Sequence, residues 1–240
     1  MFLINLQSIL KTQLAFLQKA PFMSLVLNNI TVSVNTHLTE VIMQLKNSET
    51  FKNLARAFAG ECMAKARYDY IVYGAKQEGY TELAKMVKQV ANQEFHHSRM
   101  FYSFIQTADK NAAINSVEIC AEYPFKEKWN LVDNLKFAAE DENEEATRIY
   151  PEFARIAREE GFKDIAGLFE NVVQVETCHN KLFSDLYEQL SQGKLYSRPT
   201  AVKWKCADCG YEATSKEAWK VCPLCQAKQG AVMLKLNDNN

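Results

Sequence analysis

The sequence predicts an all-α bundle of four long helices, followed by a small metal-binding module. Two observations support this fold class. Residues 49–190 repeat apolar residues at helical spacing with few glycines or prolines, and two C-x-x-C pairs, Cys206/Cys209 and Cys222/Cys225, stand near the C-terminus. A chain of 240 residues has room for one large domain or two smaller ones.

Composition excludes several classes of function. The 28 Lys and Arg residues nearly balance the 29 Asp and Glu residues, so the net charge is −1 and no nucleic-acid partner is expected. The eight glycines form no G-x-G, so the fingerprints of dinucleotide and P-loop sites are absent. No apolar run in residues 1–42 approaches the ~20 residues of a membrane span, and we expect no membrane partner.

The N-terminal segment differs from the rest of the chain. Residues 1–42 carry only three charges, Lys11, Lys19 and Glu40, and match neither a secretory signal nor a transit peptide. Because Met43 opens an ordinary protein sequence, we expect the functional chain to begin there. The predicted division is an extension (1–44), a helical bundle (45–191), a linker (192–201) and a cysteine-rich module (202–240).

Four helices are predicted between the extension and the linker, at about 49–78, 81–107, 131–159 and 163–190. Gly79 and Gly161 lie where the first and third helices should end, and Thr81 is a candidate N-cap of the second. These turns are short, so they predict two antiparallel hairpins. The longer segment Asp109–Asn130 can cross the end of the bundle, which is the ferritin-like arrangement.

An internal repeat supports the two hairpins. Residues 75–101 resemble residues 157–183 at a constant offset of 82, which places Glu94 on Glu176 and His97 on His179. Two hairpins related by a pseudo-twofold axis would bring these equivalent residues together at the centre of the bundle.

The repeat contains a candidate metal site. Glu94 and His97 are three residues apart, as are Glu176 and His179, so each pair lies on one helix face. Glu61 and Glu142 each follow an apolar stripe on the other two helices, and buried glutamates are rare unless paired or metal-bound. One Glu from each of two helices and one E-x-x-H from each of the others is the ligand inventory of di-iron carboxylate bundles. His96 faces elsewhere and is a weaker candidate.

Three further side chains have two interpretations each. Glu145, one turn after Glu142, is either a fifth carboxylate that lets the coordination change or a surface residue of an acidic run. Tyr68 and Tyr150 either donate hydrogen bonds to ligating carboxylates or pack in the core.

The four cysteines of the C-x-x-C pairs are spaced to bind one tetrahedral ion. Spacing alone does not separate zinc from iron. Cys62, Cys120 and Cys178 are isolated, and we interpret them as small buried hydrophobes or incidental thiols. Unpaired thiols favour a reducing compartment, and we expect the cytoplasm.

The chain resembles the rubrerythrin family over about residues 45–235. The matching stretches are residues 53–67 (NLARAFAGECMAKAR), Glu94–His97, residues 135–161, Glu176–His179, and the tail WKCADCGY…CPLC. The resemblance implies a ferritin-like bundle with a rubredoxin-like domain. It implies a di-iron site formed by Glu61, Glu94, His97, Glu142, Glu145, Glu176 and His179, with one further iron at Cys206, Cys209, Cys222 and Cys225. In this family Glu145 and His97 would exchange at one iron as the redox state changes.

The function implied by the resemblance is peroxide reduction in oxidative-stress defence. Electrons would pass through the four-cysteine iron from a separate NAD(P)H-dependent reductase or a rubredoxin, and the protein would be a homodimer. Cys62, Asp141 and the segment Thr214–Val221 depart from the family pattern without removing a ligand. Two alternatives remain at this stage: a ferroxidase or iron-handling bundle, and a zinc-ribbon adaptor without enzymatic activity.

Overall fold

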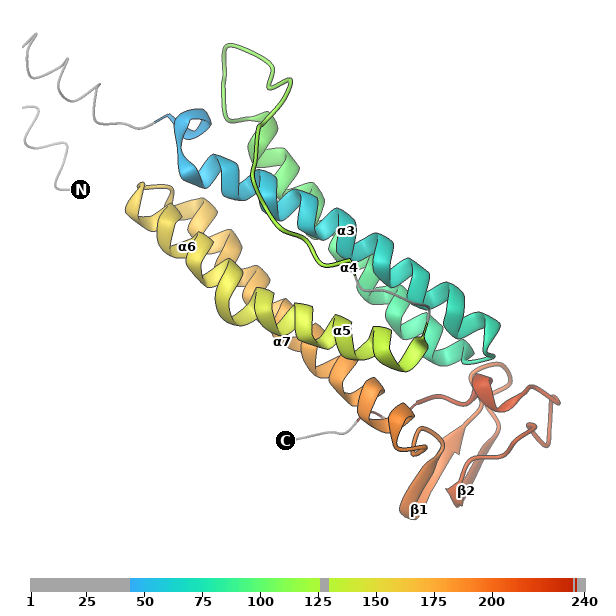
Figure 1. Cartoon of the computed structure of the whole chain (residues 1–240). Helices are drawn as coiled ribbons and strands as arrows, with labels where there is room; N and C mark the ends of the chain where they lie inside the picture. Colours follow the sequence, from blue (N-terminus) through green and yellow to red (C-terminus); the bar gives the residue numbers. More distant parts are fainter. Residues whose placement is uncertain (1–43, 126–129, 235, 237–240) are drawn as a thin grey trace, which may run out of the picture. The chain divides into compact units, whose positions relative to one another are not determined.

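The computed structural model describes residues 44–125, 130–234 and 236. Apart from Gln44 they belong to one compact unit, Leu45–Asn240. Its helices run side by side as a bundle (Figure 1). They are α3 (Glu49–Gln77), α4 (Thr81–Gln106), α5 (Leu131–Glu144), α6 (Tyr150–Glu159) and α7 (Lys163–Ser191), preceded by a short 3₁₀ turn, η1 (Leu45–Asn47). The four-helix prediction is confirmed, with α5 and α6 together forming the third helix.

Local signals explain where these helices begin and end. The side chains of Ser48 and Asn130 cap α3 and α5 by accepting hydrogen bonds from backbone N–H groups three residues on. Gly79 and Gly161 adopt positive φ angles of 85° and 89° at equivalent turns, as a left-handed C-terminal turn requires. The predicted Thr81 cap is wrong, because Thr81 is already helical and the capping position falls on Tyr80 without a side-chain bond.

The third helix is not continuous. A π-helical turn, η2 (Glu145–Ile149), separates α5 from α6. Pro151 follows at the start of α6 and has no N–H to donate to the preceding turn, so the regular α-helical ladder fails locally. The extra residue of the π turn changes the direction of the side chains that follow Glu142.

Two apolar clusters fill the bundle, one toward each end. One is built around Tyr68, Leu83, Leu135 and Phe183, and the other around Leu54, Phe101, Tyr150 and Phe169. Buried polar side chains separate them, so the bundle centre is the only stretch of described core where acidic side chains are concentrated.

The described part of the crossover (107–125) has no regular secondary structure and runs along α3 (Figure 1). The Arg56 side chain donates to the carbonyl of Cys120 at 3.1 Å, and the Tyr123 hydroxyl donates to the carbonyl of Arg56 at 2.9 Å. Lys46 pairs with Asp109 at 2.6 Å. These contacts hold the crossover against the outside of the bundle.

The C-terminal module is a two-stranded antiparallel sheet with metal-binding loops. Strand β1 (Ser197–Lys205) pairs with β2 (Glu212–Glu217), and a short turn, η3 (Gln229–Ala231), follows. Trp204 is fully buried and clusters with Ala218 and Val232. Strand β1 already begins inside the predicted linker, and Leu195 packs into the bundle core. The segment after α7 is therefore more ordered than its Gly, Ser and Pro content indicates.

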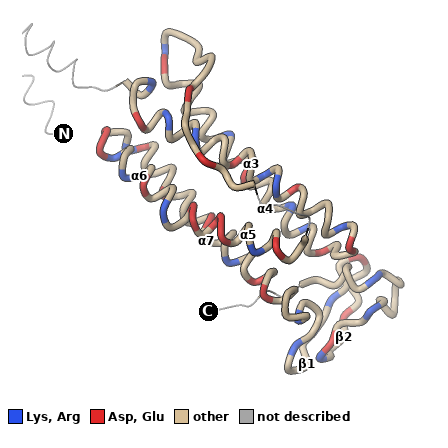
Figure 2. Tube along the Cα trace, viewed as in Figure 1, with Lys and Arg blue, Asp and Glu red and all other residues tan. Residues whose placement is uncertain are grey.

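Charged residues of both signs are interspersed along the helices (Figure 2). Among the helices of the described residues, none combines the length and the apolarity needed to cross a membrane.

A glycine of the module packs closely against the bundle. A Cβ atom on Gly230 would lie 1.7 Å from the backbone oxygen of Gly79. Replacing Gly230 by alanine should force the module away from the α3–α4 turn and lower the unfolding free energy by about 1–3 kcal/mol. Gly167→Ala is the matched control, because its Cβ meets nothing within 4 Å and it should be neutral or stabilising. Equal denaturation midpoints for the two variants would contradict this contact.

Candidate metal centres

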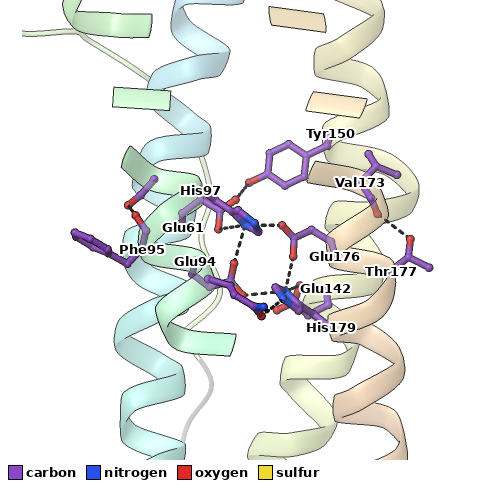
Figure 3. A network of polar contacts seen from close by, with 12 residues as sticks. Glu61, Glu94, Phe95, His97, Glu142, Tyr150, Val173, Glu176, Thr177 and His179 are labelled. Atoms are coloured by element: carbon purple, nitrogen blue, oxygen red, sulfur yellow. Dashed lines mark hydrogen bonds and ion pairs between the residues drawn. The ribbon is translucent and has the colours of Figure 1, made fainter. Parts of the chain in front are cut away.

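Six of the seven predicted bundle ligands meet between the two apolar clusters (Figure 3). They come from all four helices of the bundle and are at most 5% exposed: Glu61 on α3, Glu94 and His97 on α4, Glu142 on α5, and Glu176 and His179 on α7. The stick view shows the carboxylates and both imidazoles turned toward one another.

These side chains form two overlapping clusters, each with four potential ligand atoms within 4.8 Å of one another. The first contains Glu61 and His97, the second contains Glu142 and His179, and Glu94 and Glu176 belong to both. Nδ1 of His97 lies 2.9 Å from Glu94 and 3.0 Å from Glu176, and Nδ1 of His179 lies 3.0 Å and 2.7 Å from the same residues. Two positions bridged by two carboxylates suit a pair of metal ions.

The donor set fits iron. Several of the buried atoms that face the centre have no hydrogen-bond partner: Oε2 of Glu61, both carboxylate oxygens of Glu94, Nδ1 of His97, Oε2 of Glu142 and Oε1 of Glu176. Buried acceptors without partners are costly, and cations would satisfy them. Carboxylate oxygen and imidazole nitrogen are ligands suited to iron or manganese.

Without metal, protons must balance the charge. Burial raises the pKa of Glu61 to about 8 and raises that of Glu142 well above its usual range. Burial opposes protonation of His97, but the surrounding carboxylates of Glu176, Glu61 and Glu94 favour its charged form and raise its pKa to about 12. Metal ions bind the deprotonated groups, so loading should release protons.

The metal-free protein should therefore lose stability as pH rises. In the folded protein Glu61 keeps its proton up to about pH 8, whereas in the unfolded chain it releases the proton near pH 4.5. The contribution of this proton to the unfolding free energy is therefore lost as the pH rises from about 4.5 to 8. We expect the melting temperature of the metal-free protein to fall as the pH rises from 5 to 8. The corresponding loss of unfolding free energy should be a few kcal/mol at most. Glu61→Gln should flatten the dependence, and a wild-type melting temperature that rises over this range would contradict it.

Both predicted tyrosines contact ligand carboxylates. The Tyr68 hydroxyl donates to Glu142, and the Tyr150 hydroxyl donates to Glu61. Each tyrosine belongs to a different apolar cluster, so the two clusters hold opposite sides of the site. Of the two interpretations in the sequence, hydrogen bonding to carboxylates is the one that the geometry favours.

Glu145 lies between the buried ligand clusters and the protein surface. It begins the π turn, is half-buried and belongs to neither four-residue cluster. Burial, then the nearby charge of Glu61, raises its pKa well above the usual value. Glu145 and Tyr150 both line a cavity of about 210 Å³ that Tyr123 of the crossover also lines. The structure thus places Glu145 beside the site, within a cavity wall.

One polar contact of the site, between Gln93 and His179, was not predicted from the sequence. The side-chain oxygen of Gln93 accepts a hydrogen bond from Nε2 of His179 at 2.9 Å. Gln93 lies four residues before His97 on α4, and the available signal was its replacement by Val175 in the second copy of the repeat.

The four cysteines of the module also converge, with potential ligand sulfurs within 4.8 Å of one another. Cys206 lies 3.8 Å from Cys225, and Cys209 lies 3.7 Å from Cys222, sulfur to sulfur. Burial raises the pKa of the Cys222 thiol, but backbone N–H groups of Cys225 and Leu224 outweigh it and lower the pKa to about 7. These backbone N–H groups favour the thiolate of Cys222, whereas hydrogen bonding among the crowded thiols raises the pKa of Cys225 to about 12.

The isolated cysteines do not behave as buried hydrophobes. Cys62, Cys120 and Cys178 are all exposed free thiols. Two lie on outward faces of α3 and α7 and one lies in the crossover, because helical periodicity around the buried ligands turns their neighbours outward. That interpretation is wrong, and the incidental-thiol alternative stands.

Comparison with known proteins gives consistent matches to one family. The family model described as Rubrerythrin matches residues 52–187. A rubrerythrin of Porphyromonas gingivalis is 39% identical over 80% of this chain and 92% of its own, and one of Nitratidesulfovibrio vulgaris is 36% identical over 75% and 91%.

Solved structures confirm the ferritin-like fold. A mixed-valence nigerythrin aligns with a TM-score of 0.51 at 23% identity, covering 78% of this chain and 86% of its own. A bacterioferritin of Desulfovibrio desulfuricans with a di-iron site aligns with a TM-score of 0.52 at 20% identity, covering 62% and 84%.

Proposed function

The chain belongs to the rubrerythrin family, and we propose that it is a non-haem di-iron peroxidase that reduces hydrogen peroxide to water in oxidative-stress defence. The observation that carries the proposal is the pair of buried clusters that share Glu94 and Glu176, combined in one chain with a four-cysteine centre. A bundle that only stored or oxidised iron would have no use for the second centre.

The proposed ligands are those that the sequence predicted. Seven surround the di-iron site and four bind one rubredoxin-type iron: Glu61, Glu94, His97, Glu142, Glu145, Glu176 and His179 in the bundle, and Cys206, Cys209, Cys222 and Cys225 in the tail. Two ferrous ions held in the bundle would supply the two electrons that reduce one peroxide.

The surrounding residues would orient and shield this site. Tyr68 and Tyr150 fix the rotamers of Glu142 and Glu61 by hydrogen bonding, as outer partners of ligands do. The two apolar clusters exclude bulk water from both ends. Glu145 is free of the bridging clusters and can therefore bind or release without dismantling them.

The oxidant would approach through the cavity under the crossover. This cavity reaches Glu145 and Tyr150 and has a volume of about 210 Å³, which suits a small molecule such as hydrogen peroxide. Tyr123 lines its crossover side and is held by its bond to the backbone of Arg56. Bulky organic peroxides should therefore be poorer oxidants.

Electrons would enter at the four-cysteine centre from a separate NAD(P)H-dependent reductase or a rubredoxin, since the chain carries no dinucleotide fingerprint. The module contacts its own bundle at Gly79, and α4 runs from Thr81 to Glu94, about 20 Å along its axis. That separation favours transfer to the bundle of a second subunit, and we propose a homodimer. The seven free thiols support a reducing compartment, the cytoplasm.

Steady-state kinetics test the proposal. Purified protein with NADH and a rubredoxin reductase should consume peroxide catalytically and hold about three irons per chain. A ferroxidase would instead accumulate ferric iron beyond this number and consume no NADH. Zinc in the tail of protein matured in its own cell would contradict the electron-entry role.

Removing one tyrosine hydroxyl should weaken one metal position. Tyr150→Phe leaves Glu61 without its donor and should lower the affinity of the first cluster by about 10-fold or more. Metal titration of the metal-free protein measures this effect, with exposed Tyr102→Phe as the control. An affinity equal to that of the wild type would show that Tyr150 only packs.

A further inference from the structure

The two histidines of the metal centre differ in their second ring nitrogen. Nε2 of His179 donates to the side-chain oxygen of Gln93 at 2.9 Å. That oxygen can only accept, so Nε2 carries a proton, and Nδ1 faces the carboxylate cluster, where its lone pair would bind a metal ion. For Nε2 of His97, no hydrogen bond is recorded within the described residues.

The internal repeat explains this difference. Gln93 stands four residues before His97 and reaches across to His179 on the neighbouring hairpin. The pseudo-twofold equivalent of Gln93 is Val175, four residues before His179. Both positions are half-buried, but valine has no acceptor to offer to His97. The two halves of the repeat therefore supply equivalent ligands, but they differ in the residue that can hydrogen-bond the outer nitrogen of each histidine.

A second observation concerns the position of Glu145 relative to the cluster that contains His97. Glu145 lines a cavity with Tyr150, and Tyr150 donates to Glu61. Glu61 belongs to the cluster of His97 and is absent from the cluster of His179. The spare carboxylate thus lies on the side of the histidine that lacks an outer partner.

We propose that Gln93 is a positioning residue that makes the two metal positions unequal. Its hydrogen bond holds the His179 ring as a permanent ligand, whereas Val175 leaves the His97 ring free to turn away. The exchange of His97 and Glu145 that the family resemblance implies would then be confined to the His97 position, because Gln93 holds the His179 ring in place. This inference rests on the proposed metal-binding residues, but it needs no peroxidase activity.

Metal titration of the full-length protein gives the first test. With Zn²⁺ in the four-cysteine site, Co²⁺ should fill the metal-free bundle in two steps of different affinity. Gln93→Val should weaken the tighter step by about 10–100-fold, the usual cost of losing an outer partner of a ligand. Val175→Gln should raise the affinity of the weaker Co²⁺-binding step. The double variant, Gln93→Val with Val175→Gln, should again bind Co²⁺ in two steps of clearly different affinity.

The imidazole N–H protons give a second readout that a packing role would not move. The chain has only four histidines, so the signals shifted by bound Co²⁺ are few. The wild type should show one such N–H that exchanges slowly with solvent, from His179. Gln93→Val should lose it, and Val175→Gln should add one from His97. Gln174→Val, at an exposed neighbour on α7, is the matched control and should change nothing.

The outcomes separate the two proposals. If Gln93→Val keeps both affinities and the slow N–H, the inference is wrong while the metal site stands. If the wild-type bundle takes up fewer than two Co²⁺ ions, the ligand assignment fails, and the inference and the peroxidase proposal fail with it.

Discussion

Replacing Glu176 by alanine is expected to remove metal from both bundle positions at once. Glu176 contacts both histidines, at 3.0 Å from His97 and 2.7 Å from His179, and belongs to both clusters. Loss of an outer partner already costs about 10–100-fold in affinity, so loss of a shared ligand should cost more than about 100-fold at each position. Iron analysis after anaerobic loading should find about one iron per chain, the one in the tail.

Glu170→Ala is the matched control on the same helix. Glu170 pairs with Arg158 at an exposed site, where an ion pair contributes about 0–1 kcal/mol. This variant should keep the full iron content and peroxide activity. If Glu176→Ala kept one bundle iron with unchanged affinity, Glu176 would serve a single position and the shared-carboxylate geometry would be wrong.

Replacing Cys206 by serine should separate electron entry from peroxide reduction. We expect NADH-linked turnover to fall by at least about 100-fold, because the tail loses a ligand of its electron-transfer iron. When its bundle iron is reduced chemically, the Cys206→Ser variant should still be oxidised by peroxide in a single turnover at the wild-type rate. Iron analysis must accompany the kinetics, since only the tail iron should be missing.

Cys178→Ser is the control, because Cys178 is an isolated exposed thiol. A Cys206→Ser variant with undiminished NADH-linked turnover would show that electrons reach the bundle by another route. Loss of the single turnover with full bundle iron would show that the tail has a direct part in peroxide reduction.

Mixing the two variants tests the path between subunits. Glu176→Ala subunits keep the tail centre, and Cys206→Ser subunits keep the di-iron site. Dissociated and reassociated together, they should regain NADH-linked turnover if electrons cross from one subunit to the other. If transfer stays within a chain, the mixture remains inactive.

Much of this architecture could be predicted because its signals are local. Gly79 and Gly161 need positive φ angles and therefore end their helices in the predicted places. The i and i+3 spacing of Glu94 and His97 is enough to put them on one face, and the repeat extends the same argument to α7. Glu61 and Glu142 were predicted from the apolar stripes that precede them, and the structure brings all six side chains together.

The remainder depends on geometry between segments. The π turn at Glu145 follows from Pro151, but a residue that disrupts the ladder does not reveal whether the helix kinks or bulges. The partner of Gln93 lies 86 residues away, so only the packing of two hairpins shows it. The docking of Gly230 on Gly79 is likewise a close approach of two backbones that no spacing indicates.

Stopped-flow oxidation of the fully reduced protein tests the peroxidase claim most directly. Anaerobic ferrous protein is mixed with hydrogen peroxide or with dioxygen at equal concentration, and the absorbance of the ferric bundle and tail is followed. The account predicts that peroxide oxidises the bundle much faster than dioxygen does. Equal or faster oxidation by dioxygen, with ferric iron then accumulating in the protein, would contradict it and favour a ferroxidase.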